Sequence, residues 1–188
     1  MFRKIIGFAI VACLAWFGIV FMFSIFAGIV RLAGTVLWLA APQASILLGA
    51  AQRSIPVTVH AAVGAEIIHQ HPTADGAALG ATSHRDFKRL AASLLGLHDG
   101  GVVLNLGSAV VMPEVFLKAL AVARNLYGGK PTGFTACDCD MQRQYRPRAN
   151  VVERPTLAGG GRGIQLTGHH EILIPLLCWA VLESLDAR

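Results

Sequence analysis

Residues 101–120 read GVVLNLGSAVVMPEVFLKAL, and this stretch decides the fold. Val102–Leu106 is a mostly apolar run rich in strand-forming residues, which is typical of a buried strand in a parallel sheet. Gly107 and Ser108 then turn the chain into a helix expected from about Pro113 to Leu126. A strand, a tight glycine turn and a helix in this order predict a βα unit.

The same alternation of short apolar runs and helical periodicity continues on both sides of this unit, from Pro42 to the end of the chain. It predicts an α/β fold with a mainly parallel sheet. The segment Met141–Gly163 interrupts the pattern with two X-Pro pairs, five arginines and three consecutive glycines, so we expect it to be a functional loop outside the core. Buried strands are expected at Ile55–Ala62, Phe134–Cys139 and Ile164–Thr167, and helices at Ser45–Arg53, at Ser83–Leu95 with Ser83 as N-cap, and at Ile172–Leu185.

The composition divides the 188 residues into two parts. Hydrophobic residues make up 54% and charged residues only 14%, with a mean hydropathy of +0.57, whereas a soluble domain has about 25% charged residues. The apolar excess lies in residues 1–41, which we expect to be a membrane-inserting segment, and residues 42–188 are expected to form one α/β domain. Basic residues are scattered and do not alternate with aromatics, so no nucleic-acid binding is expected.

The first part contains Ile5–Val30, a run of residues without any charge. As a helix it would span about 39 Å, which exceeds the roughly 30 Å hydrocarbon core of a bilayer. Arg3 and Lys4 favour a cytoplasmic N-terminus for a single span. A secretory signal peptide is the rival interpretation. The run is longer than the usual apolar region of about 7 to 15 residues, but Ala40 and Ala41 could mimic a cleavage site. Leu32–Ala41 could also complete a re-entrant hairpin, so the topology stays open.

The turn after the strand expected at Val102–Leu106 is the first candidate site. Glycine permits close backbone approach at Gly107, and free N–H groups near Ser108 would attract an anion, although an ordinary tight turn fits equally well. Glu114 in the first helical turn opposes an anion, and could cap the helix or bind a cationic amine. Asp138 and Asp140 come at the end of a strand, where α/β sheets place ligand contacts, unless they only cap a turn.

Imidazole and carboxylate side chains form a second candidate site in two short segments. His69, His71 and His169 could bind zinc, with a carboxylate as general base, which would make the chain a metal-dependent hydrolase. The spacing is not diagnostic, and an isolated histidine is more often a hydrogen-bonded structural residue. The full set consists of Glu66, His69, His71, Asp75, His169, His170 and Glu171.

Three motifs in order, IPV at 55–57, GGVVLNLGSAVVMPEVFLKAL at 100–120 and GHHEILIPLL at 168–177, carry a resemblance. The chain resembles the C-terminal half of deoxyhypusine synthases, and more closely the bacterial deoxyhypusine synthase-like proteins, over about residues 42–185. The resemblance implies a Rossmann-like fold that binds NAD. The chemistry it implies is NAD-assisted transfer of an aminobutyl group from spermidine to a protein lysine.

The resemblance also implies roles for single residues. Glu66, Glu114 and Asp138 would attract the cationic polyamine. The cofactor contacts would come from Gly107, Ser108 and Asp138, and the active-site polar groups from Glu114, His169, His170 and Glu171.

Two departures from the family pattern limit what the resemblance implies. The tryptophan-glycine-lysine motif that forms the covalent imine has no counterpart, and Lys88, Lys118 and Lys130 are expected on the surface. The strands of the family's first half are missing, so we expect a sheet incomplete at its N-terminal side and impaired catalysis. Its open edge predicts a homo-oligomer or a partner chain that covers the edge. A non-catalytic, membrane-anchored interaction module is the remaining alternative.

Overall fold

The computed structural model of the chain describes residues 44–187, in two compact units that divide between Val57 and Thr58. The expected membrane-inserting segment, residues 1–41, lies outside the described residues. Among the helices of residues 44–187, none is long and apolar enough to cross a membrane.

The described part of the first unit contains one short helix, α2 (Ile46–Gln52). Ser45 is its N-cap, and the Ser45 hydroxyl accepts a hydrogen bond from the N–H of Leu48 at 3.2 Å. The helix predicted at residues 45–53 is therefore confirmed. None of its residues is buried.

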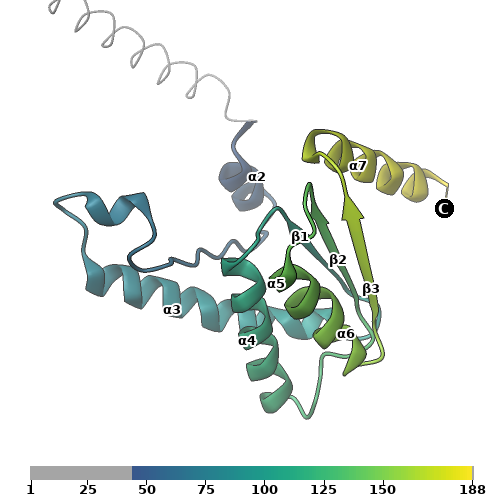
Figure 1. Ribbon diagram of the computed structural model, residues 1–188, viewed down its shortest axis with the longest axis horizontal. Helices are drawn as coiled ribbons and strands as arrows, with labels where there is room; N and C mark the ends of the chain where they lie inside the picture. The colour runs from purple at the N-terminus through teal and green to yellow at the C-terminus, as the bar shows by residue number, and fades with distance from the viewer. Residues whose placement is uncertain (1–43, 188) are drawn as a thin grey trace, which may run out of the picture. The chain divides into compact units, whose positions relative to one another are not determined.

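The second unit is built on a three-stranded, all-parallel sheet (Figure 1). The strands are β1 (Val102–Leu106), β2 (Thr135–Asp140) and β3 (Arg162–Thr167), in the order β1-β2-β3. Their register places Leu104 beside Cys137 and Cys137 beside Ile164. The predicted α/β fold with a parallel sheet is confirmed, as are three of the predicted strands.

Helical segments precede, connect and follow the strands. β1 leads into α4 (Val111–Leu126), and β3 leads into α7 (His170–Asp186). The remaining segments are η2 (Ile67–Gln70), α3 (Gly76–Ser93), η3 (Leu94–Leu97), α5 (Tyr145–Pro147), the π-helix η4 (Arg148–Glu153) and α6 (Arg154–Leu157).

The hydrophobic core lies between one face of the sheet and the helices α3, α4 and η4 (Figure 1). The sheet face contributes Ala136 and the half-buried Val103, which lie side by side in the register. Gly163 beside them has no side chain, which leaves room for Val152 of η4. The helices and connecting turns complete the buried cluster with Ala91, Leu94, Phe116, Ala119, Leu120, Ala123, Phe134 and Val151.

The opposite face of the sheet is open over much of its area in the described residues. Val102, Leu104 and Leu106 alternate with the core-facing side chains of β1, and all three are exposed. Leu166 on β3 is exposed as well. β1 is therefore buried on one face only, which corrects the prediction of a strand buried on both.

The strand predicted at Ile55–Ala62 is not formed. In the second unit, the N–H of Val59 donates to Asp86 Oδ2 at 3.0 Å, and the N–H of Ala61 donates to Ser83 Oγ at 3.2 Å. These side chains of α3 take the place of a neighbouring strand's carbonyls. α3 accordingly begins at Gly76 under an Asp75 cap, and Ser83 is not its N-cap.

The segment Met141–Gly163 was predicted to be a loop outside the core, and this is wrong. α5, η4 and α6 lie within it and cover the sheet (Figure 1). Ala149, Asn150, Val151 and Val152 are all buried. α5, η4 and α6 form one uninterrupted helical run over residues 145–157. Pro147 lies in the first turn of this run, where a missing N–H costs little, and Pro155 lies near its end, just after the π-helical part.

Candidate functional site

The turn after β1 and the start of α7 meet at the carboxyl edge of the sheet. The N–H of Gly107 donates to the carbonyl oxygen of Cys139 at 3.1 Å. The imidazole Nε2 of His170 hydrogen-bonds the same oxygen at 2.9 Å. Since a carbonyl only accepts, Nε2 carries the proton in this bond. The two segments, more than sixty residues apart in the sequence, are thus joined at one atom of β2.

Gly107 allows this meeting because it lacks a side chain. Its φ is +70°, and a Cβ there would lie 2.9 Å from Cε1 of His170. The close approach expected at Gly107 therefore occurs, but it is the ring of His170 that approaches. Of the residues predicted for the site, the structure brings these two together.

Beneath the turn, Asp138 is buried on the core-facing side of β2 with only 2% of its surface exposed. Asn105 Nδ2 donates to Asp138 Oδ1 at 2.8 Å and to the carbonyl oxygen of Ser108 at 3.0 Å. Gln165 Nε2 adds a longer contact of 3.4 Å to Oδ2. Asp138 thus acts through Asn105 to hold the turn in place, and it is not open to a ligand from the edge.

Glu114 in the first turn of α4 is engaged by cations and an amide of this chain. Its carboxylate pairs with Lys118, lies 3.4 Å from Arg146 Nε and accepts a 2.7 Å hydrogen bond from Asn150 Nδ2. The hydrogen bond from Lys118 lowers the pKa of Glu114 most, and the charges of Lys118 and Arg146 and the bond from Asn150 lower it further. The carboxylate forms no helix cap, and it is not vacant for a cationic amine.

Two long helices begin at this edge without a side-chain cap from their N-cap residues, Val110 for α4 and His169 for α7. The Ser108 hydroxyl accepts from the N–H of Met112 at 3.2 Å, which engages one donor of α4. Arg143, just after β2, donates through Nε to Thr167 Oγ1 at the end of β3, at 3.2 Å. The N–H groups of the first helical turns and the fixed guanidinium favour an anion, whereas Glu171 in the first turn of α7 opposes one, as Glu114 does in α4.

Asp140 is the last residue of β2 and lies at the same edge. Its Oδ1 accepts from the N–H of Gln142 at 3.3 Å, and its carbonyl accepts from Gly168 at 3.1 Å. Asp140 is half-buried, in contrast to Asp138. Of the two aspartates noted in the sequence, it is the one placed to reach a ligand at the edge.

Sequence reasoning missed Asn105 and Arg143. Asn105 carried a signal, since it is the one polar residue in an apolar strand. Arg143 carried none, because the segment after β2 contains five arginines of similar surroundings in the sequence.

The histidines of the metal-site alternative form separate local contacts. His69 Nδ1 contacts the Glu66 carbonyl at 3.0 Å, and His71 Nδ1 contacts Thr73 Oγ1 at 2.8 Å. Within residues 44–187, no group of three His, Cys, Asp or Glu side chains could hold a metal ion, so these two and His169 do not form one.

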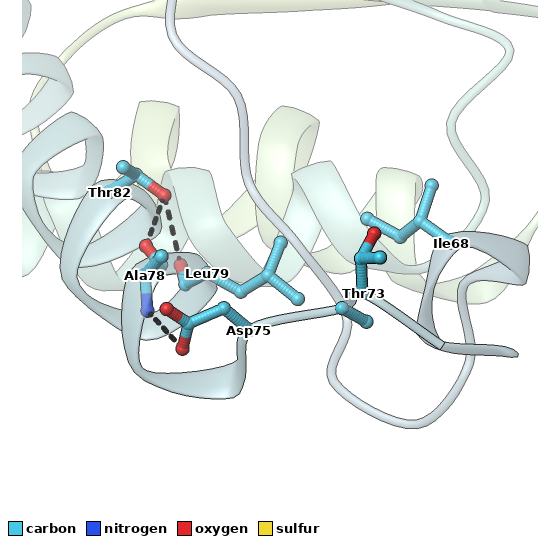
Figure 2. A pocket seen from close by; sticks show the side chains of 7 residues that line it. Ile68, Thr73, Asp75, Ala78, Leu79 and Thr82 are labelled. Atoms are coloured by element: carbon cyan, nitrogen blue, oxygen red, sulfur yellow. Dashed lines mark hydrogen bonds between the residues drawn. The ribbon is translucent and has the colours of Figure 1, made fainter. Parts of the chain in front are cut away.

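Two cavities lie away from the carboxyl edge. One of about 300 Å³ opens beside the start of α3, between Ile68, Leu79 and their neighbours (Figure 2). Asp75 and Thr82 line it, but both are engaged within α3. Asp75 accepts from the N–H groups of Ala77 and Ala78. Thr82 donates to the carbonyls of Ala78 and Leu79 (Figure 2). The second, of about 130 Å³, is an apolar gap between α3 and α4. Neither presents a group poised for chemistry.

Comparison with protein families, with curated proteins and with solved structures gives no match for this chain.

Proposed function

We propose that the carboxyl edge of the sheet binds the phosphates and ribose of an NAD-type dinucleotide, and that the chain is a deoxyhypusine synthase-like domain with a Rossmann-like arrangement. Parallel α/β sheets bind such ligands outside the carboxyl ends of their strands. The observation that carries the proposal is the meeting of Gly107 and His170 at the Cys139 carbonyl. It holds the starts of α4 and α7 at one edge.

The groups at this edge match the parts of a dinucleotide. The N–H groups at the start of α7 and the guanidinium of Arg143 would bind the phosphates. Asp140, at the end of the strand that follows the first βα unit, would accept from ribose hydroxyls. Glu114 opposes an anion less than a lone carboxylate would, because Lys118 and Arg146 lie against it.

The proposal is limited to binding. An imine-forming lysine needs a desolvated place, and Lys88, Lys118 and Lys130 are all exposed. The carboxylates expected to attract a polyamine have other partners: Glu66 accepts from the N–H of Ala62, and Glu114 and Asp138 are engaged as described above. Aminobutyl transfer by these residues is therefore not included.

Isothermal titration of the full chain with NAD, in mild detergent because of its apolar first residues, tests the proposal. We expect saturable binding in the folded protein. Arg143→Ala should weaken it about tenfold, which is roughly 1.4 kcal/mol, since a charge-assisted contact to phosphate is lost. Arg89→Ala, which removes an arginine from α3, is the matched control and should bind as the unaltered chain does.

Titration with ADP-ribose and with nicotinamide mononucleotide then shows which half of the dinucleotide the edge prefers. The absence of saturable binding up to millimolar NAD, in protein that is folded by circular dichroism, would refute the proposal. Equal weakening by both arginine substitutions would refute the assignment of Arg143.

A further inference from the structure

The face of the sheet opposite the core carries apolar side chains and has no helix packed over it in the described residues. We call this the open face and define it by Val102, Leu104, Leu106, Ile164 and Leu166. Between them, Cys137 and Cys139 of β2 complete an uncharged centre, and both are already buried, at 6% and 2% exposed, so the exposed apolar surface lies on β1 and β3. Sheets whose strands are all parallel are almost always covered on both faces, because their backbone connections place helices on both sides. Within residues 44–187 the helices α3, α4 and η4 cover only the other face.

The helix α7 is an apolar element that has no buried residue in its own chain. A helix that is apolar all round is normally buried inside a protein. Its exposed large side chains are Ile172, Ile174, Leu176, Trp179, Val181, Leu182 and Leu185.

We propose that α7 of a second copy of this chain covers the open face, reciprocally in a homodimer. The dimensions agree, since a 17-residue helix is about 25 Å long and a six-residue strand about 20 Å. α7 does not cover the open face of its own chain. Its first turn is fixed by the bond from His170 to Cys139. Beyond that turn only Leu177 is half-buried, and the other side chains up to Ala187 are exposed.

The charged residues at the ends of β3 and α7 indicate how the partner's α7 is oriented relative to the strands. Arg162 begins β3 on the same side as Val102, so its side chain lies at the amino edge of the open face. Glu183 and Asp186 lie at the C-terminal end of α7. None of these three charged groups forms an ion pair with another residue of the described part. A partner helix antiparallel to the strands, as crossover helices are, brings both acids to Arg162.

The exposed apolar area supplies about half of a typical stable interface. Only one side of α7 can meet the sheet, and Ile172, Leu176 and Trp179 share one side. These three side chains and the four exposed apolar side chains of the open face are each between 42% and 64% exposed. A large apolar side chain accounts for on the order of 100 Å², so they supply roughly 400 Å² per copy, compared with roughly 800 Å² per partner in a typical stable interface.

Crosslinking in the full chain tests the occupant directly. Val102→Cys places a thiol on the open face, and Cys178 is an exposed native thiol on α7. Chains labelled with nitrogen-15 are mixed with unlabelled chains, treated with a short bismaleimide and mapped by mass spectrometry. We expect crosslinks from residue 102 to Cys178 of the other isotope. Crosslinks to Cys178 within one chain, or to Cys13 of the N-terminal segment, would overturn the proposal by identifying a different occupant.

Sedimentation velocity provides a readout that does not depend on thiols. We expect a dimer at micromolar concentration. Arg162→Glu should weaken the dimer at least tenfold, because the introduced carboxylate would then lie opposite Glu183 and Asp186 of the other copy. Combining Arg162→Glu with Glu183→Lys and Asp186→Lys should restore the dimer. Lys88→Glu, an equal charge change on α3, should leave it intact. A monomeric full chain, or failure of the triple variant to recover in folded protein, would overturn the proposal.

Discussion

The imidazole of His170 occupies the space that a side chain on Gly107 would need, with only 2.9 Å between Cε1 and the position of such a Cβ. Both residues also hydrogen-bond the carbonyl of Cys139. The turn that follows β1 and the start of α7 therefore form one structural unit. A substitution at either residue should therefore alter the position of the other.

Gly107→Ala should destabilise the protein through two separate effects. The φ of +70° costs an L-residue roughly 1–2 kcal/mol, and displacement of His170 adds to that. Gly128 is the matched control, since its φ is +60° and nothing lies within 4 Å of its Cβ position. Urea unfolding of the full chain should show a larger loss for Gly107→Ala than for Gly128→Ala.

The double variant Gly107→Ala with His170→Ala isolates the steric part. Its free energy of unfolding should exceed the value expected from adding the two single effects, because the clash is absent once the ring is removed. Strict additivity would mean that the ring and the added methyl group do not meet.

Asn105→Ala should cost about 3 kcal/mol of unfolding free energy. It removes the shorter of the two hydrogen bonds to the buried carboxylate of Asp138 and frees the carbonyl of Ser108. Gln165→Ala removes only a 3.4 Å contact to the same carboxylate and should cost less than about 1 kcal/mol. Equal losses in denaturant titrations would contradict the assignment of Asn105 as the residue that holds the turn.

The elements that follow a single clear period were predictable from the sequence. β1, with its bounds Val102–Leu106, and the helix after it follow from one apolar run, one glycine and one proline. The apolar period of the helix predicted at residues 83–95 places Phe87, Leu90, Ala91 and Leu94 on one face, and these residues pack into the core. In each case the local pattern and the tertiary packing favour the same structure.

Where tertiary contacts compete with local pattern, prediction failed. The run Ile55–Ala62 has strand-forming residues, but the side chains of Asp86 and Ser83 on α3 accept hydrogen bonds from its backbone N–H groups. Nothing in the sequence around Asp86 or Ser83 indicates that they would do so. Similarly, the arginines and prolines of Met141–Gly163 suggest a surface loop, yet four consecutive residues from Ala149 to Val152 are buried. At the carboxyl edge, the contact of His170 with Gly107 depends on a separation of 63 residues that no motif encodes.

Release of residues 58–62 from α3 should be visible by hydrogen exchange. Asp86→Ala and Ser83→Ala each remove the side-chain acceptor of one backbone N–H, of Val59 and Ala61 respectively. We expect faster exchange at the affected amide in each variant, while the amides inside α3 keep their protection. Ser93→Ala removes a hydroxyl that bonds only within its own helix and should change neither amide.

The pH dependence of stability should contain a contribution from Glu114. Its pKa in the folded protein is lowered by Lys118 above all, so the carboxylate stabilises the fold above the ordinary value of 4.5. That contribution is lost as the pH falls through the lower folded pKa. The melting temperature of Glu114→Gln should therefore lie below that of the unaltered chain at pH 7, and the gap should close in strong acid. A gap that widens as the pH falls would reverse the sign and contradict the ion pairs.

Substitution in η4 distinguishes a core element from a surface loop. Val151 is 2% exposed and belongs to the core cluster, so Val151→Ala should cost about 1–3 kcal/mol by opening a cavity. Leu157, six residues further on, is 81% exposed, and Leu157→Ala should change stability by less than about 0.5 kcal/mol although it removes more atoms. Denaturant unfolding of both variants in the full chain measures the difference. Equally small losses would indicate that the segment lies on the surface, as its composition alone predicts.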